Sequence, residues 1–155
     1  MIHHCTVYRV ETGEIMSYSN FSLNDDPEAI ARNYSVRVRT YGETGYGFVP
    51  IEANAETHYV VMMEETPVVA ERPPLIVHTV DDRTTLVADG EDSIVLTGLP
   101  NPCEIIIDDP DPDVQTEVIS VSGGGFVFMA DDPGVYTVEV RRWPFLPFKI
   151  EFTAT

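Results

Sequence analysis

The sequence predicts a mostly β protein, in which a small N-terminal β module with one short helix is followed by an immunoglobulin-like β-sandwich. Short runs of β-branched and aromatic residues recur along the chain, and Gly, Pro, Asn and Asp separate them. Only one stretch carries convincing helix-start signals. The adjacent Pro73 and Pro74 favour an extended connector. We therefore expect two domains, a β-rich module at 1–74 and a sandwich at 75–155.

The N-terminal module is expected to open with a hairpin, because Glu-Thr-Gly-Glu at 11–14 supplies turn residues between two strand-like runs. A short helix is expected at 24–32, where an aspartate can cap the free N–H groups and Pro27 suits the first helical turn. A further turn is expected at 64–67. The expected strands of this module are 6–10, 15–21, 48–51 and 57–63.

The C-terminal domain is predicted to contain strands alone, at the spacing of a sandwich. Apolar and polar side chains alternate cleanly near its end, where Tyr136, Val138 and Val140 belong to one face. Asp132-Pro-Gly134-Val-Tyr136 has the pattern of a tyrosine corner, in which Gly134 makes the turn and the Tyr136 phenol bonds back to the backbone. The cysteine pair and tryptophan of antibody domains are missing from these strands, so a generic sandwich is expected. The expected strands are 84–88, 93–99, 104–107, 114–121, 125–129, 135–140 and 148–152.

The charge balance is strongly acidic, with 26 Asp and Glu against 9 Lys and Arg and a formal net charge of -17. Such a surface repels phosphate backbones and anionic membranes, so neither nucleic acid nor a membrane is an expected partner. The opening residues lack the apolar core of a signal peptide, which favours synthesis in a cytoplasm. Cys5 and Cys103 lie far apart in the sequence and are expected to stay reduced.

Enzymatic activity is not expected. No serine or cysteine stands in a nucleophile motif, and His58 lies within a strand-like run, where it is expected to face solvent or a strand neighbour. A deep polar pocket around His58 or His78 would be needed to revive an enzymatic hypothesis.

One acidic segment is a candidate metal site. Four carboxylates between two expected strands could supply the hard oxygen ligands that Ca²⁺ prefers: Asp108, Asp109, Asp111 and Asp113. Their spacing departs from an EF-hand, because the sixth-position glycine and twelfth-position glutamate are missing. The alternative interpretation is a solvated acidic loop that keeps edge strands from pairing. Ca²⁺ is the one cofactor that the sequence suggests, and the solvated loop is the favoured interpretation.

The connection between the last two strands is apolar, whereas turns are usually polar. Trp143, Phe145 and Leu146 could form a rigid knob with the composition of an interface anchor. The alternative is that they fold back and close the end of their own sandwich. We expect a division, with Phe148 facing inward while Trp143 and Phe145 remain at least partly available.

The order of several short motifs resembles small virion-associated proteins of tailed bacteriophages. These motifs are Ala55-Glu-Thr-His-Tyr-Val60, Glu71-Arg-Pro-Pro74, Thr97-Gly-Leu-Pro-Asn-Pro-Cys103, Asp132-Pro-Gly-Val-Tyr-Thr-Val138 and Arg142-Trp-Pro-Phe-Leu-Pro147. In such proteins a β module that ends in this way is often followed by an Ig-like domain. The resemblance spans roughly residues 8–152, and the insert at 24–47 departs from the shorter family pattern.

The resemblance implies a non-enzymatic structural role in the phage particle, with a place on the tail tip or fibre attachment favoured over capsid decoration. Other virion proteins would then be the partners, and the chain would act as a homo-oligomer or in a symmetric ring. It would be made in the host cytoplasm and reside in the virion. A hypothesis of another class is a Ca²⁺-dependent binding or adhesion module that uses the four aspartates.

Overall fold

A computed structural model of the chain describes residues 3–21, 45–49 and 51–155. The chain divides into two compact units, Met1–Arg72 and Pro73–Thr155. Almost all regular structure in the described residues is β-strand, with one short 3-10 turn, η1 (Val80–Asp82), so the mostly β fold class is confirmed. The helix expected at 24–32 lies outside the described residues.

The N-terminal unit contains a three-stranded antiparallel sheet in the order β2–β1–β3 and a separate hairpin, β4–β5. The expected strand at 48–51 starts two residues earlier and pairs with β1. The turn expected at 64–67 is tighter, because Glu64 and Glu65 adopt positive φ and the chain is extended again from Thr66. The hairpin strand β5 was therefore missing from the prediction. The bounds are β1 His3–Arg9, β2 Ile15–Phe21, β3 Tyr46–Val49, β4 His58–Met63 and β5 Thr66–Glu71.

A small core joins the hairpin to the sheet of this unit. Its buried side chains are Tyr8, Ile15, Val49, Ala53 and Val60. The Val60 N–H donates to the Gly13 carbonyl over 2.8 Å. Gly13 has a φ of +72°, and a Cβ there would lie 1.9 Å from the Val60 carbonyl oxygen. Glycine is required at this turn because both the backbone conformation and the close approach exclude a side chain.

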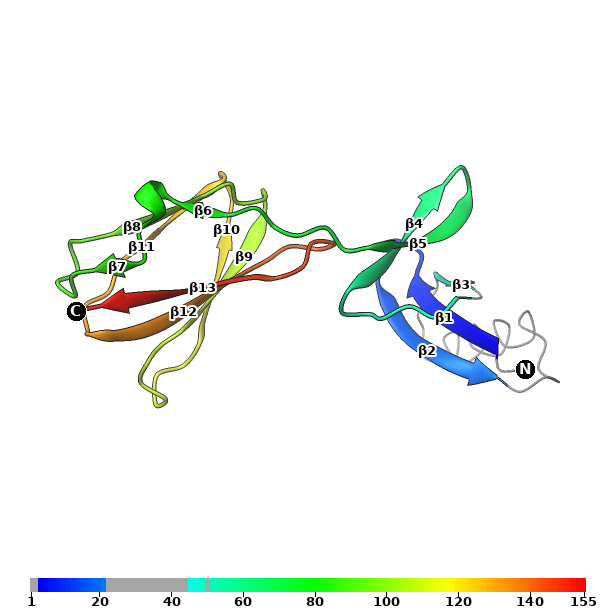
Figure 1. The fold of residues 1–155 in the computed structure, drawn as a ribbon, viewed down its shortest axis with the longest axis horizontal. Coiled ribbons are helices and arrows are strands. Elements are labelled where there is room, and N and C mark those ends of the chain that lie inside the picture. The colour runs from blue at the N-terminus through cyan, green and yellow to red at the C-terminus, as the bar shows by residue number, and fades with distance from the viewer. Residues whose placement is uncertain (1–2, 22–44, 50) are drawn as a thin grey trace. The chain divides into compact units, whose positions relative to one another are not determined.

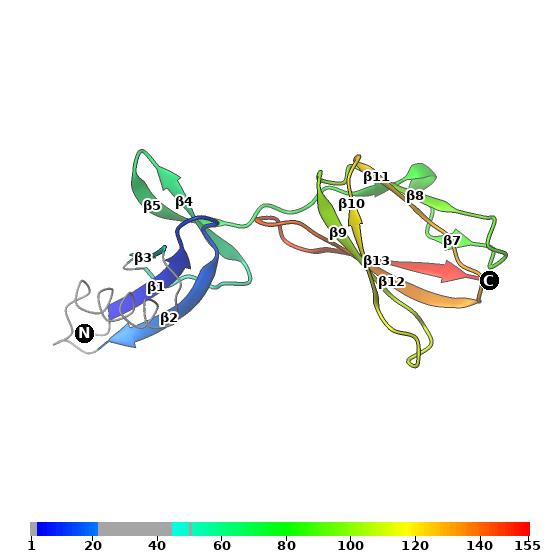
Figure 2. The same ribbon diagram turned by 180° about the vertical axis from the view of Figure 1, so that it is seen from behind.

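The C-terminal unit is a sandwich of two sheets, which Figures 1 and 2 show from opposite sides. The larger sheet has the order β10–β9–β12–β13–β7, and the smaller has the order β11–β8–β6. Neighbouring strands are antiparallel except for β7 and β13, which are parallel. The bounds are β6 His78–Thr79, β7 Thr85–Leu86, β8 Ile94–Thr97, β9 Cys103–Asp108, β10 Glu117–Val121, β11 Gly125–Phe128, β12 Gly134–Arg141 and β13 Phe148–Ala154.

The core of the sandwich follows the alternation read in the sequence. Val138 and Val140 of β12 and Phe152 of β13 are fully buried, and so are Ile94 and Leu96 of the facing β8. The inner faces of the two sheets therefore supply one continuous core, as in sandwiches generally. All seven expected strands are present, although β7, β8 and β10 are shorter than expected. The two-residue strand β6 was not predicted.

A tyrosine-corner bond fixes the turn into β12. The Tyr136 hydroxyl donates to the Asp132 carbonyl over 2.9 Å. The Tyr136 ring meets the Phe128 ring edge-on, with 5.4 Å between centroids. A Cβ at Gly134 would lie 2.4 Å from the Pro110 ring, so glycine there lets the loop after β9 pack against the start of β12.

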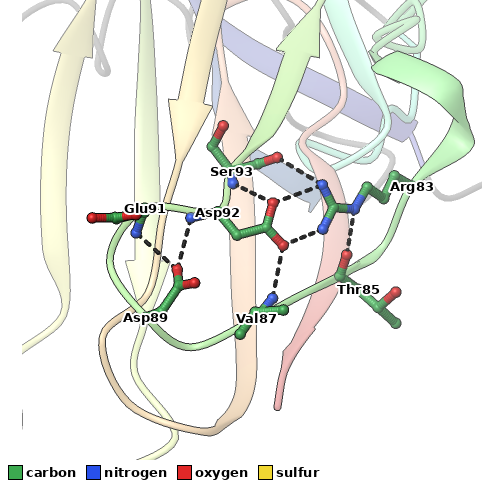
Figure 3. Close-up of polar contacts among 7 residues, drawn as sticks. All are labelled: Arg83, Thr85, Val87, Asp89, Glu91, Asp92 and Ser93. Atoms are coloured by element: carbon green, nitrogen blue, oxygen red, sulfur yellow. Dashed lines mark hydrogen bonds and ion pairs between the residues drawn. The ribbon is translucent and has the colours of Figure 1, made fainter.

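A polar network holds the loop between β7 and β8, and Figure 3 shows it. The Arg83 guanidinium binds both carboxylate oxygens of Asp92 and donates to the carbonyls of Thr85 and Ser93. The same carboxylate accepts the Val87 N–H over 2.8 Å. The hydrogen bond from Arg83, with smaller contributions from the Val87 and Ser93 N–H groups, lowers the Asp92 pKa from 3.8 to about 2. The Arg83–Asp92 ion pair thus provides hydrogen-bond partners for backbone groups of a segment that has few β-ladder hydrogen bonds of its own.

Candidate docking site at the loop end of the sandwich

The apolar loop between β12 and β13 is attached to the segment that enters the sandwich. The Leu146 N–H donates to the Pro73 carbonyl over 2.9 Å, and Leu146 forms a parallel bridge with Pro74. The Phe145 N–H closes the turn on the Arg142 carbonyl over 2.8 Å. Pro73 and Pro74 accordingly belong to the C-terminal unit, two residues before the boundary that the sequence suggested.

The side chains of this loop are neither fully buried nor fully exposed. Trp143, Phe145 and Leu146 are each half-buried, and Phe148 packs partly buried against the sandwich core. The structure therefore brings the three predicted interface residues together in one anchored loop. Phe148, the first residue of β13, packs against the sandwich core, while Trp143, Phe145 and Leu146 each keep part of their surface exposed.

A surface pocket of about 370 Å³ lies beside this loop. The start of β9, the end of β12 and the neighbouring β10 form its walls, because Arg141 pairs with Glu104 and Ser120 pairs with Glu104 from the other side. The lining residues are Pro102, Cys103, Glu104, Ser120, Arg141, Arg142 and Trp143. A volume of this size is at the small end of the range that ligand pockets occupy.

Arg141 is engaged by an ion-pair network on the outer face of the larger sheet. The Glu139 side chain lies between Arg141, which it contacts closely, and Lys149, whose Nζ is 3.0 Å from a carboxylate oxygen. Only 5% of Glu139 is exposed. The hydrogen bond from Arg141 is the main cause that lowers the Glu139 pKa, and Lys149 adds to it. Glu139 therefore stays ionised and orients Arg141 along the pocket wall.

Arg142 differs from Arg141 in having no such partner. It is exposed, and among the described residues no carboxylate or carbonyl accepts a hydrogen bond from its guanidinium. Burial raises the pKa of the neighbouring Cys103 thiol, and the positive charge of Arg142 lowers it to a smaller extent. Cys103 is a buried free thiol and not part of a disulfide. The side chain of Cys5 lies outside the described residues.

The acidic segment begins at the end of β9, whereas the pocket is lined by residues at the start of β9, so the two lie at opposite ends of this strand. Its carboxylates accept hydrogen bonds from within the loop. Asp108 accepts from the Thr116 hydroxyl, Asp109 from the Asp111 N–H and Asp111 from the Asp113 N–H, each over 2.8 to 2.9 Å. In the described parts of the chain, no three His, Cys, Asp or Glu side chains converge as metal ligands do. The structure thus does not bring the four candidate Ca²⁺ ligands together.

Neither of the histidines singled out in the sequence is among the residues that line this pocket. His58 is half-buried at the start of β4, where its Nδ1 is 2.8 Å from the Thr57 hydroxyl oxygen. His78 is exposed on β6 in the other unit. Within the described residues, no helix is long and apolar enough to span a membrane.

The cationic wall of the pocket was missed in the sequence analysis. A signal was nevertheless present, because Arg141 and Arg142 are adjacent in a domain whose other cations are only Arg83 and Lys149. The aromatic Trp143 that follows them was identified, but as part of an apolar knob. Its position beside two guanidinium groups gives the site a mixed character, both cationic and aromatic.

Comparisons with known proteins give little further information. No protein-family model matches the chain, and no curated protein matches it. Among solved structures, a glycosyl hydrolase family 2 member from Bacteroides cellulosilyticus matches 98% of this chain at 16% identity, with a TM-score of 0.33. The chain spans 21% of that protein's length. A match at this level carries no argument about fold or activity.

Proposed function

We propose that this chain is a non-enzymatic structural component of a tailed bacteriophage particle, associated with the tail, and that it acts by docking onto other virion proteins. The phage assignment rests on the order of short motifs along the sequence, from Ala55-Glu-Thr-His-Tyr-Val60 to Arg142-Trp-Pro-Phe-Leu-Pro147. The docking role rests on the loop end of the sandwich.

One observation carries the docking role, namely the anchored loop with its adjoining pocket. The Leu146 backbone is fixed to Pro73, so the half-buried Trp143 and Phe145 are presented by a loop of defined shape. Aromatic residues and arginine in a pre-formed surface are the side chains that contribute most to protein interfaces. A rigid anchor also costs little conformational entropy when a partner binds.

The sandwich beneath this loop suits a part that must keep its shape in an assembly. Its fully buried core, the bonded tyrosine corner and the Arg83–Asp92 network all restrict local motion of the frame. If such a unit were repeated around a symmetric ring, many weak contacts would act together and increase the overall avidity for the partner.

Quantitative mass spectrometry of purified particles tests the phage assignment. A low copy number relative to the major capsid protein, in a small multiple that matches tail symmetry, is the expected result. A ratio near parity with the capsid protein would instead identify a capsid decoration. Absence of the chain from particles would refute the phage role altogether.

A further inference from the structure

We propose that the pocket beside Trp143 binds an acidic side chain of a partner protein, one carried on an otherwise uncharged and partly apolar peptide segment, and that Arg142 selects it. This inference names the chemistry of the partner and rests on the docking role proposed above. It does not depend on where in a phage particle the chain resides.

The charge distribution of the C-terminal unit carries the first step. Residues 75–155 contain 15 acidic and 4 basic side chains, a net charge of -11. Arg83 is bound to Asp92, and Arg141 and Lys149 share Glu139. Arg142 is thus the cation of this unit that no carboxylate satisfies. An anion that approaches the unit is repelled elsewhere and finds an unpaired guanidinium at this pocket.

The other lining residues determine what kind of anion fits. Ser120 offers a hydroxyl donor, while Pro102 and the half-buried Trp143 supply apolar walls. Glu104 lines the same pocket and is paired in register with Arg141, so it limits the net positive charge there. A single carboxylate on an apolar segment matches this combination, whereas a run of carboxylates would meet Glu104 and the surrounding acidic surface.

The pocket is also held in shape before any partner arrives. Arg141 is fixed by the nearly buried Glu139, and the loop that bears Trp143 is tied to Pro73 through Leu146. Arg142 therefore projects from a wall whose other parts are already ordered. Binding needs to order little more than the Arg142 side chain, which favours recognition of a short segment.

Tryptophan fluorescence gives a direct test, because Trp143 is the single tryptophan of the chain and lines the pocket. The full chain is titrated to millimolar concentration with a blocked tetrapeptide that carries one glutamate among apolar residues. The control peptide has glutamine in its place. We expect a saturable change with the glutamate peptide and binding weaker by roughly ten-fold with the glutamine peptide, since a charge-assisted hydrogen bond is lost.

Matched variants separate the pocket from general electrostatics. Arg142→Gln should weaken the binding of the glutamate peptide by roughly ten-fold. Arg83→Gln removes the same charge at the Asp92 ion pair, outside the pocket lining and outside the Glu139 network, and should change the affinity by no more than about two-fold. Arg142→Lys should restore part of the binding, because it keeps the charge and loses only the fork geometry.

Three results would overturn the inference. These are equal binding of both peptides, equal losses in Arg142→Gln and Arg83→Gln, and the absence of any saturable change in the wild-type protein. Light scattering adds a fourth, because self-association that Arg142→Gln abolishes would make a second copy of the chain the occupant. The titration needs no phage particle, so its failure leaves the mass-spectrometric test of the phage role unaffected.

Discussion

Tyr136 illustrates, at the scale of single residues, how a polar group is accommodated at the edge of a core. Its ring packs on Phe128 while its hydroxyl reaches the Asp132 carbonyl. Tyr136→Phe keeps the ring and removes the bond, so we expect a loss of about 1 kcal/mol in unfolding free energy. Urea unfolding followed by Trp143 fluorescence measures it. Val135→Thr, on the exposed neighbour, is the control and should change stability by less than about 0.5 kcal/mol.

We expect Asp92 to make a pH-dependent contribution to the free energy of unfolding. Its folded pKa is about 2 against an ordinary 3.8, so the folded state binds fewer protons than the unfolded state in this range. The stabilisation is therefore present above about pH 4 and is lost as the pH falls toward 2. The Asp89 pKa is lowered too, chiefly by the Asp92 N–H, and it adds to the effect.

The comparison of wild type with Asp92→Asn isolates this contribution from that of the other carboxylates. The stability difference between the two proteins should be constant near neutrality and shrink between about pH 4 and pH 2. Urea unfolding across this range measures the difference. If the difference in unfolding free energy stayed constant down to pH 2, the ion pair between Arg83 and Asp92 would not stabilise the loop.

Sequence patterns located some functional residues and not others, for a physical reason. Trp143, Phe145 and Leu146 were recognisable because apolar residues are unusual in a turn. Glu139 and Arg141 lie two residues apart on β12 and so share a face, and only the contact of Lys149 with Glu139 depends on the register between β12 and β13. Arg142 follows the last residue of β12, where the alternation of a strand ends, so its lack of a carboxylate partner could be identified only in the structure.

At the scale of elements, strand β9 offers a matched pair of substitutions. Ile105 is fully buried between the sheets, whereas Ile106 is half-buried on the opposite face. Ile105→Val should lower the free energy of unfolding by about 1 kcal/mol, because it leaves a small cavity, and Ile106→Val should lower it clearly less. Urea unfolding of both variants measures the difference. Equal costs would contradict the register that places Ile105 opposite Val140.

Strands with clean alternation were predicted well, and those whose pairing depends on distant residues were not. β12 and β13 show the period of two along their whole length, and both occur as expected. β6 has only two residues and exists because His78 and Thr79 pair with β8. β5 follows directly on the positive-φ turn at Glu64 and Glu65, so the sequence pattern assigns its first residues to the turn. Neither element has a periodic signal long enough to read.

At the scale of the whole chain, the Pro-Pro segment has a second role beside that of a connector. The sequence identified it as a break between two domains, and the boundary between the two compact units falls just before it, between Arg72 and Pro73. Its backbone, however, is used by the sandwich, because Pro73 accepts from Leu146 and the following Leu75 packs against the core. The apolar end loop is therefore explained partly by a contact to residues some seventy positions earlier, which no local pattern could reveal.

This dual role predicts where the sandwich must begin in order to be fully stable. A fragment of residues 73–155 retains the Pro73 carbonyl and Leu75, whereas a fragment of 77–155 loses both. We expect the shorter fragment to be less stable by about 2 kcal/mol, from one hydrogen bond and one partly buried leucine. Urea unfolding followed by far-UV circular dichroism measures the difference.

A third fragment, residues 71–155, provides the control for this measurement. It adds Glu71 and Arg72, which belong to the N-terminal unit, where the Arg72 N–H donates to the Thr57 carbonyl over 2.8 Å. These two residues should add no stability to the isolated sandwich, so the 71–155 and 73–155 fragments should unfold at the same urea concentration. If 77–155 also matched them, the contact between the end loop and Pro73 would carry no stabilisation, and the loop that presents Trp143 would lack the rigidity on which the docking role depends.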